Sequence, residues 1–128
     1  MATNPKYHDI GRSFVQQYYT LLDGDAHARR SLANFYTADT SLMTFEGQQL
    51  VGQRKITERF ETLDLKSQHT LTEIDTQPTQ EGGVLVVVLG QVKTDDDPPQ
   101  TFNQTFVLKP SGESFYVQHD IFRLALQS

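Results

Sequence analysis

Apolar residues recur along the first part of the chain with the spacing of amphipathic helices. Ile10, Phe14 and Tyr18 follow one another at four-residue steps, and a proline close to the N-terminus suits a first helical position. This pattern predicts a helix over residues 5–22, which an Asp-Gly-Asp segment then ends. The same periodicity predicts a second helix within residues 28–36.

The hydrophobic period then changes from that of a helix to that of a strand. Residues 40–45 alternate, a Glu-Gly pair offers a turn, and residues 49–51 return, so we expect a small hairpin. Farther along, apolar residues at i, i+4 and i+7 predict a third, short helix; they are Ile56, Phe60 and Leu63.

The rest of the chain has the pattern of a sheet. Four apolar or alternating segments are separated by turn residues: 66–76, 84–93, 101–109 and 114–126. Three helices therefore precede a four-stranded antiparallel meander. Segregated helices and strands indicate an α+β domain, in which a curved sheet wraps a helical layer. At 128 residues, we expect one domain over residues 1–128.

Charge and composition exclude several classes of function. The net charge of −5 repels phosphate backbones and anionic membranes, so nucleic acid is not expected as a ligand. The chain has no cysteine, which excludes a disulfide framework and a thiolate nucleophile. It also has neither a signal-peptide pattern nor an apolar run of membrane-spanning length, so we expect neither export nor membrane insertion, and the cytosol or nucleus fits best.

The sequence predicts neither a metal nor a cofactor. Its four histidines show no metal-binding spacing; they are His8, His27, His69 and His119. The Gly82-Gly83 pair, just before residues 84–93, lacks the Lys and Ser/Thr of a phosphate-binding loop.

The segment TDDDPP, residues 94–99, places three adjacent carboxylates in a predicted hairpin loop. One interpretation is a solvated loop that protects a sheet edge from aggregation. The other is an acidic patch for a basic partner, stiffened by the two prolines so that less loop entropy is lost on binding.

Aromatic residues in the last strands exceed what one sheet face needs to pack on three modest helices; they are Phe102, Phe106, Phe115 and Phe122. This surplus favours a homodimer over a monomer.

Five segments of the chain resemble the nuclear transport factor two family. They are FVQQYY at 14–19, MTFEGQQ at 43–49, QH at 68–69, LGQVKTDDDPP at 89–99 and HDIFRLAL at 119–126. The similarity covers essentially the whole chain. It implies a cone-shaped, cystatin-like α+β fold, with three N-terminal helices packed against a curved, mainly antiparallel sheet.

The resemblance also implies a function. The family is a homodimeric adaptor without catalytic residues; it binds the GDP form of the GTPase Ran together with Phe-Gly-repeat nucleoporins, and it carries Ran into the nucleus. Such a protein is found in the cytoplasm and nucleus, and is enriched at the nuclear pore.

The resemblance assigns site residues by position. The Ran-binding rim comprises Glu46, Asp95, Asp97 and His69, whereas Asp96 is expected to point away by strand alternation. The Ran-binding pocket wall comprises Phe45, Leu63, Val87, Ile121 and Phe122.

The chain departs from well-known members of the family at four positions. Tyr7 stands at a nucleoporin-binding position where many members have Trp, and Phe45 stands where some have Trp. Both keep an aromatic platform of smaller area. Ser67 and Gln100 make the pocket rim more polar than in some members.

Two other functions compete with this interpretation. A small cavity enzyme, an isomerase or a dehydratase on the same scaffold, would use Tyr18 or Tyr36 with Asp120 as its acid and base. A messenger RNA export paralogue would act as a heterodimer and would not need the acidic rim that Glu46, Asp95 and Asp97 provide.

Overall fold

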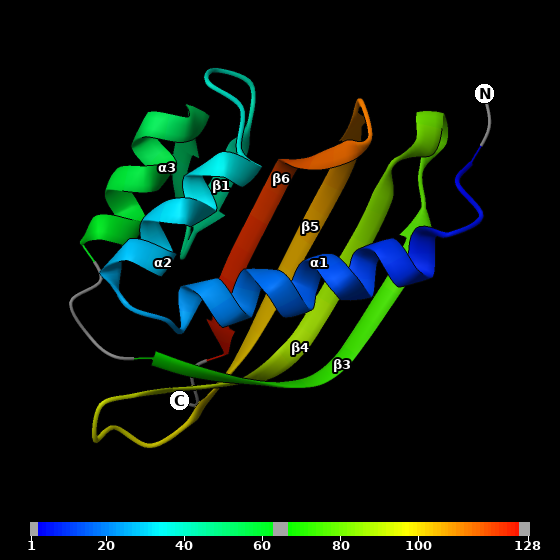
Figure 1. Ribbon diagram of the computed structural model, residues 1–128. Coiled ribbons are helices and arrows are strands. Elements are labelled where there is room, and N and C mark those ends of the chain that lie inside the picture. The colour runs from blue at the N-terminus through cyan, green and yellow to red at the C-terminus, as the bar shows by residue number, and fades with distance from the viewer. Residues whose placement is uncertain (1–2, 63–66, 126–128) are drawn as a thin grey trace.

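The computed structural model describes residues 3–62 and 67–125, and its helices precede most of its strands (Figure 1). The helices are α1 (Tyr7–Leu22), α2 (Ala26–Ser31) and α3 (Gly52–Glu61), with 3-10 turns η1 (Leu32–Phe35) and η2 (Gln80–Gly82). The strands are β1 (Leu42–Phe45), β2 (Gln48–Val51), β3 (Ser67–Pro78), β4 (Val84–Thr94), β5 (Gln100–Ser111) and β6 (Ser114–Ala125). The predicted α+β class is confirmed.

The strands form one curved, mixed sheet in the order β2-β1-β6-β5-β4-β3. The meander from β3 to β6 is antiparallel, as predicted. The β1–β2 hairpin extends the same sheet, because β1 pairs in parallel with β6. The sequence pattern gave no sign of this pairing, since parallel neighbours are joined by long connections rather than by a local turn.

Helix α1 lies across the concave face of the sheet (Figure 1). Its apolar face buries Phe14, Val15 and Tyr18. Gly11 allows the close approach, because a Cβ atom there would lie 2.7 Å from Cγ2 of Thr76. The helix begins two residues after Pro5, because Asn4 forms a turn first: its Oδ1 accepts the Lys6 N–H at 2.9 Å.

The core lies between this helix layer and the inward side chains of the long strands. Alternate residues of β4, β5 and β6 are buried, among them Val86, Val88, Phe102, Phe106 and Val117. Each fully buried side chain of this kind contributes roughly 1.5–3 kcal/mol of transfer free energy. In the described part of the chain, no helix is long and apolar enough to cross a membrane.

Candidate functional site

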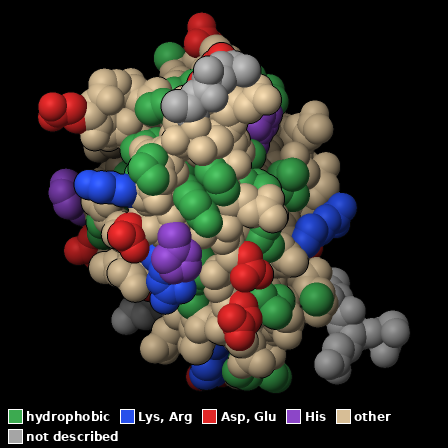
Figure 2. All heavy atoms as spheres, turned by 90° about the vertical axis from the view of Figure 1, so that its right-hand side faces the viewer, with side chains coloured by type: hydrophobic (Ala, Val, Ile, Leu, Met, Phe, Trp, Pro, Cys, Tyr) green, Lys and Arg blue, Asp and Glu red, His purple; other side chains and the backbone are tan. Residues whose placement is uncertain are grey.

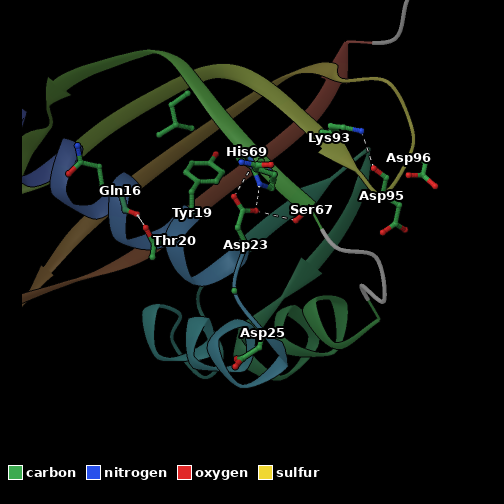
Figure 3. Close-up of a pocket in the computed structure, with 13 residues that line it drawn as sticks. Gln16, Tyr19, Thr20, Asp23, Asp25, Ser67, His69, Lys93, Asp95 and Asp96 are labelled. Atoms are coloured by element: carbon green, nitrogen blue, oxygen red, sulfur yellow. Dashed lines mark hydrogen bonds and ion pairs between the residues drawn. The ribbon is translucent and has the colours of Figure 1, made fainter.

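A pocket opens between the C-terminal end of α1, the start of β3 and the β4–β5 hairpin (Figure 3). Its volume of about 1340 Å³ suits a side chain of a partner better than a single ion. Four carboxylates line it, from Asp23, Asp25, Asp95 and Asp96. No group of three or more acidic and histidine side chains in the described residues could hold a metal ion.

The hairpin acids carry charges that the fold does not neutralise. The turn closes with a hydrogen bond from the Asp97 N–H to the Thr94 carbonyl at 2.9 Å, and Asp95 has φ +46°. Lys93 Nζ donates to the backbone carbonyls of Asp95, at 3.0 Å, and Asp97, at 3.2 Å. Within residues 3–62 and 67–125, no side-chain cation pairs with the carboxylates of Asp95, Asp96 or Asp97.

The strand alternation behind the expected orientation of Asp96 does not hold in this segment. Asp95 and Asp96 line the pocket, whereas Asp97 is not among the described residues that line it. The expectation assumed strand alternation, but this segment is a turn between β4 and β5, where the two-residue period of a strand does not apply.

On the opposite wall of the pocket, Asp23 forms two hydrogen bonds with His69. His69 Nδ1 lies 2.6 Å from Asp23 Oδ1, and the His69 backbone N–H donates to Asp23 Oδ2 at 2.8 Å. Ser67 Oγ donates to Asp23 Oδ1 at 3.2 Å. The His69 side chain is only 5% exposed. The predicted rim residue His69 therefore lies in the pocket wall, with a partner that sequence reasoning did not identify.

An aromatic row connects His69 with two of the predicted pocket residues. We use this name for the rings of His69, Phe102, Phe122 and Phe45. Their centroids are separated by 5.2, 5.6 and 4.9 Å in that order, and the last pair is stacked. The Arg59 guanidinium caps the row, 4.2 Å from the Phe45 centroid. Phe102 completes the row; the sequence indicated it only as one of the surplus aromatic residues in the last strands, and not as part of the site.

Three other predicted pocket residues are not in the row. Val87 and Ile121 lie on the outer face of the sheet, opposite the buried Val86, Val88 and Phe122, so their assignment to the pocket wall is wrong. Strand alternation is the reason, because Ile121 and Phe122 are neighbours and cannot share a face. Leu63 lies outside the described residues. Neither Phe45 nor Phe122 lines the open pocket within the described ranges.

Glu46 lies in the β1–β2 turn, where its φ is +50°. Its Oε1 accepts the Leu124 N–H at 2.5 Å, and its own N–H donates to the Phe122 carbonyl at 3.1 Å. These contacts fix the exposed Glu46 carboxylate beside the end of β6, next to Phe45, the last ring of the row. Glu46 does not line the pocket.

A buried polar network lies behind the pocket. Tyr36 Oη donates to Asp120 Oδ2 at 2.7 Å, and Gln104 Nε2 donates to Asp120 Oδ1 at 2.8 Å. Tyr18 Oη lies 3.3 Å from Tyr36 Oη, and Tyr19 Oη donates to Gln104 Oε1.

Asp120 is the titratable centre of this network. It is 1% exposed, and burial raises its carboxyl pKa to about 6, against the opposing effect of its hydrogen bonds. Burial, followed by the charge of Asp120, raises the pKa of Tyr36 well above its ordinary value, so this phenol keeps its proton and donates it. Of the five network residues, only Tyr19 lines the pocket. The sequence suggested Asp120 only as a candidate cavity acid, and did not identify Gln104.

Comparison with known proteins gives a consistent result. The model of the "Nuclear transport factor 2 (NTF2) domain" matches residues 10–124. A "Probable nuclear transport factor 2" of Caenorhabditis elegans is 42% identical over 132 residues, covering 100% of this chain and 99% of the relative. The "Nuclear transport factor 2" of Saccharomyces cerevisiae is 40% identical over 121 residues, covering 92% and 94%.

A solved structure supports the same relationship. The nuclear transport factor 2 of Cryptosporidium parvum superposes with a TM-score of 0.90 at 36% sequence identity. The match covers 97% of this chain and 98% of that one.

Proposed function

The chain belongs to the nuclear transport factor 2 family, and from this premise we propose that it binds Ran-GDP and Phe-Gly-repeat nucleoporins and carries Ran-GDP into the nucleus. Its relatives support a role in nuclear transport, and their name suggests a non-enzymatic, nucleocytoplasmic factor. Enrichment at the nuclear pore is part of the proposal.

The observation that carries the Ran proposal is the set of hairpin carboxylates without side-chain partners beside a pocket. Lys93 donates to backbone carbonyls, so among the described residues no side-chain cation pairs with the carboxylates of Asp95 and Asp96, which both line the pocket. Such charges favour a basic partner surface, because they speed association and fix its orientation, and a charge pair that the complex buries also makes binding sensitive to the loss of either partner.

Aromatic contacts would supply the apolar part of the affinity. Burying one aromatic side chain of Ran removes about 150–250 Å² from water, worth roughly 4–6 kcal/mol before the cost of association. Within the described residues, Tyr19, His69 and Leu71 line the pocket and provide aromatic and apolar surface for this contact. The resulting complex would be reversible, as an adaptor requires. Discrimination between GDP and GTP would come from the switch segments of Ran.

The proposal is tested by calorimetric titration of the protein with Ran loaded either with GDP or with a non-hydrolysable GTP analogue. We expect binding in the micromolar range to the GDP form alone. Raising the salt concentration should weaken it, because counterions screen the exposed carboxylates. Binding to neither form would overturn the proposal, while equal binding to both would contradict its nucleotide selectivity.

Nucleoporin binding is proposed at Tyr7, the first residue of α1. The side chain is half-buried and packs against the core, far along α1 from Asp23. Figure 2 faces this end of the molecule and shows hydrophobic side chains gathered across its middle. Phenylalanines of the repeats would find an apolar surface there.

Changing Tyr7 to Ala should weaken binding of a Phe-Gly-repeat peptide and leave Ran-GDP affinity unchanged, because Tyr7 is remote from the pocket. Tyr7→Phe, which keeps the ring, serves as the matched control and should bind the peptide as the wild type does. Fluorescence anisotropy of a labelled repeat peptide measures both variants. Unchanged peptide binding by Tyr7→Ala would remove this residue from the nucleoporin site.

The outer face of the sheet supports a homodimer. Leu42, Leu89 and Ile121 are 40%, 40% and 48% exposed there, although side chains of this kind are usually buried. A second copy packed against this face would cover them. A native mass of two chains at micromolar concentration is the expected result, and a single chain would contradict the dimer.

The buried network gives the enzyme alternative little support. Tyr18, Tyr36 and Asp120 do lie together, but none of them lines the pocket, and each is 3% exposed or less. An acid and a base that act on a substrate must come within hydrogen-bond reach of it. The retained hairpin acids, in turn, weigh against the messenger RNA export paralogue.

A further inference from the structure

Asp23 occupies a position where a carboxylate by itself is unfavourable. It is the C-terminal cap of α1, and the last carbonyl groups of a helix give that end a partial negative charge. The Asp23 side chain is 22% exposed, so water screens it only in part. An acid in this place needs compensating donors.

All three compensating donors come from the start of β3. They are the His69 backbone N–H, the His69 ring and the Ser67 hydroxyl. Asp23 thus joins α1 to a strand 46 residues away in sequence. In Figure 3 the Asp23 side chain points at His69 and Ser67. Two bonds to the same residue, one to its backbone and one to its ring, fix the direction of the imidazole.

The ring is also held on its sides. The Tyr19 centroid lies 5.0 Å from that of His69, and Phe102 meets His69 edge-on at 5.2 Å and 88°. An ionised carboxylate only accepts hydrogen bonds, so the ring nitrogen facing Asp23 must carry a proton. In the neutral ring, Nε2 is then an acceptor, and among the described residues it has no hydrogen-bond partner.

We propose that Asp23 is the positioning residue of this pocket: it fixes the plane and tautomer of His69, so that Nε2 is presented to a hydrogen-bond donor of the bound partner. The inference rests on the proposed function, because the partner is the protein that enters the pocket. Asp23 acts through His69 and not by its own charge. The basic groups of the partner meet the hairpin acids on the opposite side of the pocket.

Asp25 provides a matched control. It lies two residues away, lines the same pocket and carries the same charge, but its Oδ1 caps α2 by accepting the Ala28 N–H at 2.8 Å, and it does not contact His69. Asparagine keeps that cap. Asp23→Asn and Asp25→Asn therefore remove one charge each from the same pocket, and only Asp23→Asn disturbs the support of His69.

Two measurements test the inference. Long-range ¹H–¹⁵N spectra of the histidine rings, recorded where His69 is neutral, should show protonated Nδ1 in the wild type and in Asp25→Asn, and a changed tautomer population in Asp23→Asn. Calorimetry with Ran-GDP should show affinity about tenfold weaker for Asp23→Asn than for Asp25→Asn, the magnitude of one lost hydrogen bond. When His69 is also changed to Ala, the Asp23→Asn and Asp25→Asn variants should have equal affinities for Ran-GDP.

The outcomes separate this inference from the proposed function. If the wild type binds neither form of Ran, the proposed function fails, and the ring spectra alone decide whether Asp23 sets the tautomer of His69. A ring protonated at Nε2 in the wild type overturns the inference. Equal Ran-GDP affinities of Asp23→Asn and Asp25→Asn overturn it as well, even when the wild type binds Ran-GDP.

Discussion

Replacing Asp95 with Asn should abolish detectable binding of Ran-GDP while leaving the free energy of unfolding nearly unchanged. If the complex buries Asp95 in a hydrogen-bonded charge pair, removing this partner costs roughly 2–5 kcal/mol of binding free energy, enough to move a micromolar complex beyond detection. In the free protein Asp95 has no side-chain partner among the described residues, so folding loses little. Asparagine also tolerates the positive φ of this turn.

The control for this prediction is Glu113→Gln. Glu113 is an exposed acid in the β5–β6 turn, at the opposite end of the hairpins from Asp95 (Figure 1). Glu113→Gln should leave the affinity for Ran-GDP unchanged, because this residue is remote from the pocket. Calorimetry gives the affinities and thermal melts give the stabilities. A large fall in melting temperature for Asp95→Asn would show that this residue acts in the fold, and retained affinity would remove it from the Ran site.

Because of Asp120, the free energy of unfolding should fall as the pH rises from about 4 to about 7. Its pKa is raised from 3.8 to about 6 in the folded protein, so the folded state holds this proton more tightly than the unfolded state does. The stabilisation is complete below the unfolded pKa and is lost as the pH rises through the folded pKa. Two pKa units correspond to about 3 kcal/mol of unfolding free energy.

Comparison with Asp120→Asn isolates this effect, because all other groups titrate in both proteins. Chemical unfolding at several pH values between 4 and 7, at one protein concentration, should give a wild-type stability that falls relative to the variant as the pH rises. The control is Asp75→Asn, because Asp75 is an exposed acid on the outer face of β3. The free energy of unfolding of this variant should change with pH in parallel with that of the wild type. Parallel curves for Asp120→Asn and the wild type would show that Asp120 keeps an ordinary pKa.

The parts of the fold that depend on local periodicity were predictable from the sequence. Each long strand falls within about two residues of its predicted range, because alternation and turn residues are local signals. The second predicted helix, within residues 28–36, corresponds in the structure to the end of α2 followed by the 3-10 turn η1. The parallel pairing of β1 with β6 was not predictable, since it joins Met43 to Asp120 across most of the chain.

The candidate site was predictable in its charge but not in its geometry. The TDDDPP segment and the resemblance identified the acidic hairpin, and the resemblance placed His69 beside it. Assigning pocket residues by position placed Val87 and Ile121 on the wrong face, because a family match does not state on which side of a strand a residue lies. Asp23 escaped notice, and Phe102 was noted only as one of the surplus aromatic residues, because each acts through a contact with a residue distant in sequence.

The sequence by itself determined the class of fold, the negative charge, the acidic hairpin and the family. These follow from residue type, local spacing and matching segments. Only the tertiary structure decided that Asp23 supports His69, that Phe102 joins His69 to Phe122, and that Asp120 is buried among tyrosines instead of lying at the surface. The physical reason is that hydrogen bonds and ring contacts depend on which strands become neighbours, and that choice is made by packing of the whole chain.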